Sequence, residues 1–257
     1  MKAGAGSVPG RVVAAWRLTW TLTTLVVVQA LVCFVAVLPP VLIWRLLQRV
    51  TGSHPTAQWL VGSAAVVPLY VLFALLLALV SPLAVRALGW RTPPDAEMRL
   101  AEMGWPLLSW VRFGASVHLA RVVAGTLFRG TPIWTAHLRL NGARLGKRVY
   151  INSLSVSDYN LLTCGDDVVV GGGVHMSGHT VEKGVVKTGR VHLGDRVTIG
   201  LDCVVEIDVE IGSDVQVGAM SFVPKHARLP GGATYVGVPA MPIGQSAAAR
   251  HQHERAT

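Results

Sequence analysis

The stretch VHLGDRVTIGLDCVVEIDVEIGSDVQVGAMSFVPKHARLPGGATYV, residues 191–236, decides the fold. A large apolar residue returns at every sixth position along it, and glycine or proline follows most of these places. A small or branched residue stands four positions after each of them, beginning with Val197. An internal period of six residues is the sequence signature of a parallel β-helix. The repeating positions are Leu193, Ile199, Val205, Ile211, Val217, Val223, Leu229 and Tyr235.

Each hexad predicts one short strand and one turn, so that three hexads complete a coil. The aliphatic side chain then points inward and stacks on the residue eighteen positions later. Backbone groups pair with the coils above and below, which leaves open edges only at the two ends. An antiparallel sandwich is the alternative, but it needs hairpin loops instead of unbroken hexads. We therefore expect an all-β left-handed parallel β-helix over residues 139–244.

The period extends upstream with two breaks. Leu145 and Ile151 are six residues apart, and the run Cys164, Val170 and Met176 follows an irregular piece at residues 152–162. Seventeen residues then separate Met176 from Leu193, which is not a multiple of six. We expect residues 179–190 (HTVEKGVVKTGR) to protrude as a polar loop from one corner, and such loops on rigid scaffolds often carry function.

The first part of the chain predicts a membrane hairpin over residues 1–98. No charged residue occurs from Leu18 to Trp44 or from Trp59 to Val85, and each run exceeds the roughly 20 residues that cross a bilayer. Pro39 and Pro40 are expected to end or kink the first helix near Leu38. The first run is longer than the apolar region of a cleaved signal peptide, and a second run follows it. An anchor is the better interpretation.

Basic residues predict the orientation of this hairpin. They are more frequent outside the two runs than in the loop between them, which holds Arg45 and Arg49. The positive-inside rule then places both termini and the β-helix in the cytoplasm, at the inner cell membrane. The net charge of +9 is interpreted in the same way, with membrane lipid rather than nucleic acid as partner, because no run interleaves basic and aromatic residues. The flanking residues are Lys2, Arg11, Arg17, Arg86, Arg91 and Arg99.

Residues 99–138 are expected to connect the two parts. The apolar and basic residues of 104–130 fit an amphipathic helix on the inner leaflet, and equally a helix that caps the β-helix. The tail at 245–257 is expected to be disordered. The three cysteines, Cys33, Cys164 and Cys203, form no close pair and are interpreted as packing residues.

SGHTVE at 177–182 and VHLGDRVTIG at 191–200 resemble the active-site region of hexapeptide acetyltransferases such as galactoside and maltose acetyltransferases. GAMSFVPK at 218–225 and GVPA at 237–240 resemble the end of that domain. The resemblance implies that His179 is the general base and that chains form a homotrimer with the donor groove between subunits. It also implies that the pantetheine of the donor lies along Ala219, Met220, Ser221 and Lys225.

A second resemblance covers nearly the whole chain. The two apolar runs, GTPIW at 130–134, LRLNGARLG at 138–146 and DYNLLTCGDD at 158–167 are similar to one repeat unit of the C-terminal region of epsilon-poly-L-lysine synthetase and related peptide synthetases. That family implies an aminoacyl group carried as the phosphopantetheine thioester of a carrier protein and an amine as acceptor. A homotrimer of this chain would match the family's three tandem units.

The chemistry requires a base beside the thioester carbonyl, and an imidazole suits this task near neutral pH. Glu182, three residues after His179, or Asp158, from an adjacent coil, is expected to orient the ring. No metal is required, because a thioester is already activated. His175 and His192 flank the loop, so a three-histidine metal site between subunits stays open as a minor alternative.

We therefore expect an acyltransferase that forms peptide or isopeptide bonds from a carrier-bound donor. The donor expected from the resemblance is a carrier thioester or acyl-coenzyme A. AMPIGQSAAAR at 240–250 offers no basic residue before Arg250, whereas related acetyltransferases often place basic residues there for coenzyme A. The alternatives are a coenzyme A-dependent O-acetyltransferase and a non-catalytic membrane scaffold for a synthetase or carrier protein.

Overall fold

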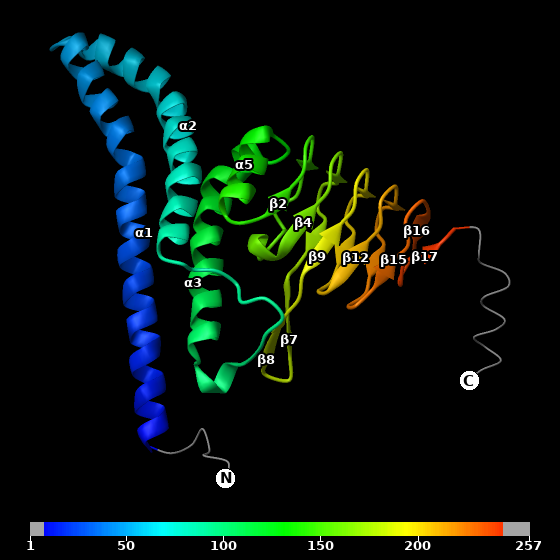
Figure 1. Ribbon diagram of the computed structural model, residues 1–257. Coiled ribbons are helices and arrows are strands. Elements are labelled where there is room, and N and C mark those ends of the chain that lie inside the picture. Colours follow the sequence, from blue (N-terminus) through cyan, green and yellow to red (C-terminus); the bar gives the residue numbers. More distant parts are fainter. Residues whose placement is uncertain (1–7, 244–257) are drawn as a thin grey trace, which may run out of the picture. The chain divides into compact units, whose positions relative to one another are not determined.

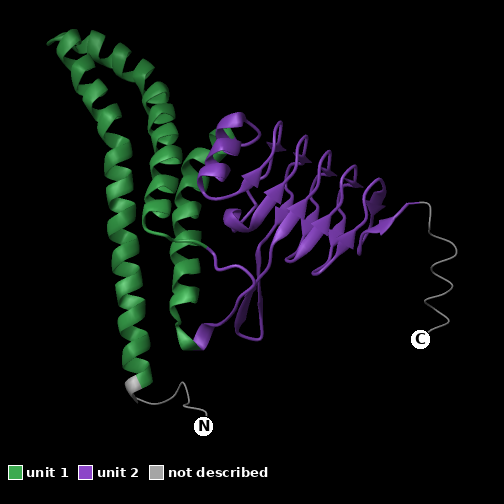
Figure 2. Cartoon of the chain, in the orientation of Figure 1, with its two compact units in different colours: residues 1–91, 102–128 green, residues 92–101, 129–257 purple. Residues whose placement is uncertain are grey.

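A computed structural model describes residues 8–243, and the chain divides into two compact units (Figures 1 and 2). A helical unit contains Met1–Arg91 and Glu102–Phe128, and a β unit contains Thr92–Ala101 and Arg129–Thr257. Residues 92–101 group with the β unit and residues 102–128 with the helices. The domain boundaries expected at 98 and 138 stay a prediction. The expected disordered tail at 245–257 lies outside the described residues.

The helical unit is built on α1 (Val8–Thr51) and α2 (Pro55–Ala87). Among the described residues these two helices are long and apolar enough to cross a membrane. The first helix does not end near Leu38, since α1 continues through Pro39 and Pro40, and a kink at this point stays a prediction. Proline fixes φ near the helical value, so it removes hydrogen bonds to the preceding turn without forbidding the helix.

Most apolar side chains of α1 and α2 face outward. Only 17% of the most apolar 18-residue segment of α1 and 22% of that of α2 is buried. A helix in a soluble core buries a broad apolar face. The buried cluster between them is small, with Val32, Ala36 and Leu77 at its centre. The outward surface is therefore suited to a hydrocarbon environment.

Helix α3 (Trp105–Ala120) lies within residues 104–130. It packs on α1 and α2 and buries Leu107, Leu108 and Phe113. A π-helical turn, η2 (Arg121–Gly125), and α4 (Thr126–Phe128) follow. The hydroxyl of Tyr70 donates to the carbonyl of Val123 within that turn, at 3.0 Å.

Charge is distributed unevenly between the two units. The helical unit carries nine lysines and arginines but only one acidic residue, Glu102, whereas the β unit carries fourteen basic and thirteen acidic residues. Nearly all of the net charge of +9 therefore belongs to the helices. Basic side chains beside long apolar helices are suited to lipid headgroups.

The described part of the β unit forms a coil of three parallel-stranded sheets (Figure 1). The three sheets have six, three and five strands, and the parallel pairing between successive coils confirms the parallel coil of hexads. The first sheet ends in one antiparallel pair, β16 with β17. Its strands are β3 (Tyr150–Ile151), β5 (Val169–Val170), β10 (Thr198–Ile199), β13 (Gln216–Val217), β16 (Thr234–Val236) and β17 (Met241–Pro242).

The second sheet contains β6 (His175–Met176), β11 (Val204–Val205) and β14 (Phe222–Val223). The third contains β2 (Arg144–Leu145), β4 (Leu162–Cys164), β9 (Val191–Leu193), β12 (Val209–Ile211) and β15 (Arg228–Leu229). Pairing follows the predicted register: Ile199 lies beside Val217, eighteen residues later. The inward positions of the hexads, such as Ile199 and Ile211, are fully buried.

Helix α5 (Pro132–Leu140) covers the first coil, where it contacts β2 and β3. The side chain of Thr131 caps its first turn by accepting from the backbone N–H of Trp134, and Pro132 occupies the first helical position. The residues of α5 that are buried include Trp134, His137 and Leu138. Helix α5 therefore closes the first coil of the β unit.

Both breaks in the period fall at one corner, where the chain leaves the second sheet. Val156 still bridges to Met176, and eight residues instead of six then lead to Cys164. The seventeen-residue spacing after Met176 begins at the same corner. We call residues 157–161 the first insertion, residues 177–190 the second insertion, and this edge of the coil the insertion corner.

The second insertion is a β-hairpin and not an irregular loop. β7 (His179–Glu182) and β8 (Val185–Thr188) pair antiparallel, and β1 (Glu97–Arg99) pairs with the outer side of β8. Lys183 and Gly184 both have positive φ, as the tight turn of a two-residue hairpin requires. The three strands form a small sheet of their own.

Candidate active site

The two insertions bring one carboxylate and one imidazole together. Nδ1 of His179, the first residue of β7, lies 2.5 Å from Oδ2 of Asp158 in the first insertion. Of the two orienting residues that the sequence offered, Asp158 is the one that contacts the ring. We call Asp158 and His179 the dyad.

Asp158 is held in place by three donors. The Thr92 hydroxyl donates to Oδ1 at 2.6 Å, and the Ser157 hydroxyl donates to Oδ2 at 3.0 Å beside the imidazole. The Asp158 backbone is left-handed, with φ of 51°, and its side chain is only 4% exposed. A buried carboxylate with this many donors has a fixed orientation and a stabilised charge.

Burial and hydrogen bonding act in opposite directions on both members of the dyad. Burial alone would raise the pKa of Asp158, but the bonds from His179, Thr92 and Ser157 outweigh it and lower that pKa below its ordinary value. Burial also opposes protonation of His179. The hydrogen bond and charge of Asp158, with a smaller contribution from Glu206, nevertheless raise the pKa of His179 above its ordinary value.

The contact with an ionised Asp158 determines the tautomer of His179. An ionised carboxylate can only accept, so Nδ1 of His179 carries the proton and donates it to Asp158. Nε2 of the neutral ring is then the basic nitrogen. The His179 side chain is 29% exposed, so the ring is reachable while its partner is buried. The arrangement suits a general base that takes a proton at Nε2.

Gly178 allows the two insertions to approach each other. A Cβ at this position would lie 2.8 Å from the Cβ of Asp158 and 3.1 Å from a methyl group of Leu161. The first of these distances is too short for a real side chain. The glycine therefore admits the close contact on which the dyad depends.

Glu182, the other orienting residue predicted from the sequence, pairs with lysines and not with His179. It forms an ion pair with Lys225 and a second with Lys187, at 3.4 Å. Residues three apart on a strand point to opposite faces, so Glu182 and His179 face different sides of the hairpin. The sequence argument for Glu182 used a spacing that brings side chains together on a helix, and this segment is a strand. Its bond to Lys225 instead ties the hairpin to the turn after β14.

The predicted donor turn lies at another corner. Ala219 and Met220 are exposed between β13 and β14, and Met220 is 76% exposed. Ser221 is 2% exposed, and its hydroxyl accepts from the backbone N–H of Gly237. Within one chain the topology places this turn before the second sheet and His179 after it, so His179 and the donor turn occupy different corners of the coil.

The three histidines of the minor metal interpretation do not converge in the chain. His175 lies on β6 of the second sheet and His192 on β9 of the third. Among the described residues no group of three histidine, cysteine or acidic side chains is arranged to hold a metal. The cysteines are free thiols, and burial raises the pKa of Cys164 to about 12, so this thiol is unreactive.

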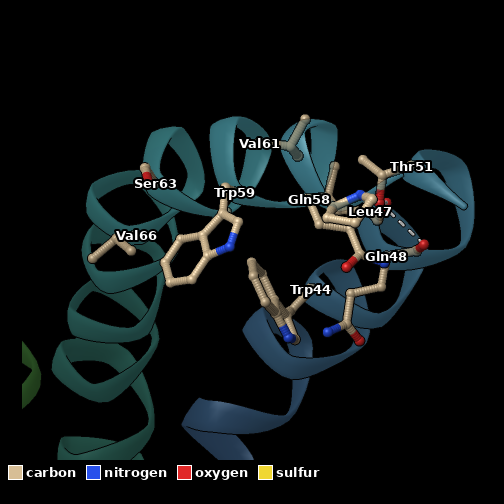
Figure 3. Close-up of a pocket in the computed structure, with 11 residues that line it drawn as sticks. Trp44, Leu47, Gln48, Thr51, Gln58, Trp59, Val61, Ser63 and Val66 are labelled. Atoms are coloured by element: carbon tan, nitrogen blue, oxygen red, sulfur yellow. Dashed lines mark hydrogen bonds between the residues drawn. The ribbon is translucent and has the colours of Figure 1, made fainter. Parts of the chain in front are cut away.

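The helical unit contains a separate cavity near the turn between α1 and α2 (Figure 3). It measures about 500 Å³, and the rings of Trp44 and Trp59 line it together with the amide side chains of Gln48 and Gln58. A Cβ at Gly62 would lie 3.1 Å from the Trp44 ring, so the small residue leaves room for the indole. The lining contains no charged residue.

The sequence did not reveal Thr92 or Ser157 as part of the site. Thr92 stands 66 positions before Asp158, just after the second apolar run, and no spacing links the two. Ser157 directly precedes Asp158, in the irregular piece. The one usable signal was that piece itself, because it interrupts the period on the same side of the coil as the second insertion.

Comparison with known proteins places the fold in context. No protein-family model matches the chain. It is 25% identical over 163 residues to delta-poly-L-ornithine synthetase of Acinetobacter baumannii strain AB307-0294, a match that covers 62% of this chain and 12% of that protein. The chain thus spans about an eighth of the length of that relative.

Among the solved structures that match the chain are three acetyltransferases. The serine acetyltransferase of Neisseria gonorrhoeae matches with a TM-score of 0.39 and 20% identity, over 75% of this chain and 62% of that chain. The maltose O-acetyltransferase of Clostridium difficile 630 matches with a TM-score of 0.39 and 19% sequence identity. The match covers 52% of this chain and 86% of that chain. A galactoside acetyltransferase in complex with coenzyme A matches with a TM-score of 0.35 and 23% sequence identity. The match covers 43% of this chain and 68% of that chain.

Proposed function

We propose that the protein is a membrane-anchored acyltransferase in which His179 is the general base and Asp158 orients it. The buried, multiply hydrogen-bonded pair of His179 and Asp158 carries this proposal. A structural pair at a coil corner has no need of a buried carboxylate or of three donors. Desolvation with a specific charge partner is typical of catalytic groups.

The proposed reaction is transfer of an acyl group from a thioester. An acceptor amine or hydroxyl attacks the thioester carbonyl while Nε2 of His179 removes its proton. The C–S bond of the resulting tetrahedral intermediate then breaks, and the thiolate leaves with a proton returned from the imidazolium. Asp158 stays ionised throughout, keeps the ring in the tautomer with a basic Nε2, and stabilises the imidazolium.

For the donor we favour an aminoacyl group on the phosphopantetheine of a carrier protein, and for the acceptor an amine. The similarity to a poly-ornithine synthetase supports amide-bond formation. Between Arg228 and the end of the described residues at 243 there is no lysine or arginine to meet the phosphates of coenzyme A. A coenzyme A-dependent O-acetyltransferase is the second candidate, favoured by the acetyltransferase-like motifs at 177–182 and 218–225.

We further propose a homotrimer of left-handed coils with an active site at each interface between subunits. His179 and the exposed turn at Ala219 and Met220 belong to different corners of one chain, and a neighbouring subunit can supply the second corner. Mixing a His179→Gln chain with a Met220→Arg chain before assembly tests this proposal. Partial recovery of transfer is expected, whereas two inactive chains that stay inactive together would contradict a shared site.

The helical unit is proposed to anchor the enzyme at the inner membrane, with both termini and the β unit in the cytoplasm. The outward apolar faces of α1 and α2 and the excess of basic residues in this unit support that placement. A phosphopantetheine thioester is also a cytoplasmic donor, so the orientation agrees with the chemistry.

The function is tested with the full chain in detergent or proteoliposomes. Two donors are offered, an aminoacyl thioester of a phosphopantetheinylated carrier protein and acetyl-coenzyme A, each with an amine and a hydroxyl acceptor. Aminoacyl transfer from the carrier that is lost in His179→Gln supports the main proposal. Transfer from acetyl-coenzyme A alone supports the second candidate, and carrier binding without turnover would show a scaffold.

A further inference from the structure

We infer that Thr92 is a positioning residue of the active site, and that residues 92–96 form a strap that fixes Asp158 and His179 relative to each other. The inference rests on the proposed function. Its first observation is the 2.6 Å bond from the Thr92 hydroxyl to Oδ1 of Asp158. Thr92 is fully buried, so no water competes for this bond.

The bond determines which way the carboxylate turns. Thr92 donates to Oδ1, and Oδ2 is thereby left to face Nδ1 of His179. Loss of the Thr92 hydroxyl would remove one of the bonds that fix the orientation of this buried carboxylate. Thr92 therefore acts on His179 through Asp158 and has no role as a proton carrier.

The backbone of Thr92 is held by the same insertion that it serves. Its N–H donates to Oδ1 of Asn160 at 3.2 Å, and Nδ2 of Asn160 donates to its carbonyl at 2.8 Å. The side chain of Asn160 thus bonds to both the N–H and the carbonyl of Thr92, as the backbone of a neighbouring strand would. Pro93 and Pro94 follow and favour an extended chain at this point.

The rest of the strap holds the second insertion. The hydroxyl of Thr188 donates to the carbonyl of Pro93 at 2.7 Å and accepts from the N–H of Ala96 at 2.9 Å. Thr188 is the cross-strand partner of His179 in the hairpin. The strap therefore bonds to the first insertion at Thr92 and to the second at Thr188, one contact on each side of the dyad.

Thr92→Val tests the inference in the full-length protein, because valine keeps the shape and removes the hydroxyl. We expect kcat to fall roughly tenfold, the size expected when a hydrogen bond to a charged group is lost, with KM unchanged. The acidic limb of the rate profile should move to lower pH, because a carboxylate free to turn stabilises the imidazolium less. The charged groups that act on the ring are Asp158 and Glu206.

Two further variants make the test specific. Thr92→Ser retains the hydroxyl and should restore kcat and the pH profile. Thr198→Val removes an exposed hydroxyl from β10 and should change neither. A Thr92→Val protein with wild-type kcat and an unmoved pH limb would overturn the inference. If His179→Gln is also fully active, the proposed function fails; if His179→Gln is inactive, the function stands and only the role of Thr92 is lost.

Discussion

Two histidine–aspartate pairs in the described part of the coil differ in burial and in their further partners. Nδ1 of His179 lies 2.5 Å from Asp158 at the two insertions, and Nδ1 of His226 lies 2.7 Å from Asp208 in the regular coils. Both aspartates have left-handed backbones, with φ of 51° and 52°. The side chains of Asp158 and Asp208 are 4% and 42% exposed, and those of the histidines 29% and 69%.

The difference shows what the breaks in the period accomplish. At the regular corner Asp208 also pairs with Arg228, so it belongs to a ladder of solvated ions. At the insertion corner the carboxylate is buried, and Ser157 of the first insertion and Thr92 of the strap donate to it. An exposed pair contributes little because water screens it, whereas a buried and hydrogen-bonded pair holds its proton firmly. The regular coils provide the scaffold and the insertions provide the chemistry.

Removing the two imidazoles should separate the pairs most clearly. We expect His179→Gln to lower the rate of acyl transfer by about 10²- to 10⁴-fold, the usual contribution of general base catalysis. His226→Gln is the matched control and should leave the rate unchanged. Single-turnover transfer at fixed donor concentration measures both. Equal losses in the two variants would show that the insertion corner has no special role.

A core substitution should produce the opposite pattern. Ile199 is fully buried between Val170 and Val217 of the neighbouring coils. Ile199→Ala is expected to lower the free energy of unfolding by roughly 2–5 kcal/mol while the transfer rate per folded molecule is kept. Denaturant unfolding of the purified protein together with the transfer assay checks both parts. A rate that collapses at unchanged stability would contradict the division between scaffold and chemistry.

The two aspartates should also behave differently. Asp158→Asn places an amide donor beside Nδ1, which favours the tautomer with the proton on Nε2 and removes the charge that stabilises the imidazolium. We expect a loss on the order of 10²-fold and an acidic limb of the rate profile at lower pH, because the pKa of His179 is no longer raised. Asp208→Asn should change neither. A limb that does not move in Asp158→Asn would argue against this coupling.

The buried pair should leave a smaller signature in stability. Asp158 has a pKa below its ordinary 3.8, so its contribution is present above that pH and is lost as pH falls through the lower folded value. His179 has a pKa above its ordinary 6.5, so its contribution is complete below 6.5 and is lost as pH rises through the raised value. Between these limits Asp158→Asn should cost roughly 1–3 kcal/mol in urea unfolding. A cost that does not vary with pH would contradict the coupling.

The hexad pattern was sufficient to predict the coil because the constraint is local and repeated. Each inward position such as Ile199 or Ile211 must be apolar, and each corner must turn. The period is therefore visible in the order of the residue types. The insertion corner was also foreseeable, since a break in a strict period marks an excursion. The hairpin inside it was missed: KG at 183–184 is a tight-turn pair, but the segment was interpreted by its polarity alone.

The site itself was only partly predictable. Asp158 was predicted from its place in a coil adjacent to His179, and the structure brings the two together. Glu182 was named from a spacing that suits a helix, and the strand turns it toward Lys225. Thr92 carried no signal, because it reaches the carboxylate through tertiary folding across 66 positions and not through any local pattern.

The most direct measurement is the titration of His179 by NMR of the imidazole nitrogens, in the intact protein and in Asp158→Asn. We predict that Nδ1 of His179 keeps its proton across the titration, with a pKa above 6.5 that falls when Asp158 is replaced. A His179 ring that carries its neutral proton on Nε2, or that titrates identically in both proteins, would contradict the claim that the two insertions build a coupled acid–base pair.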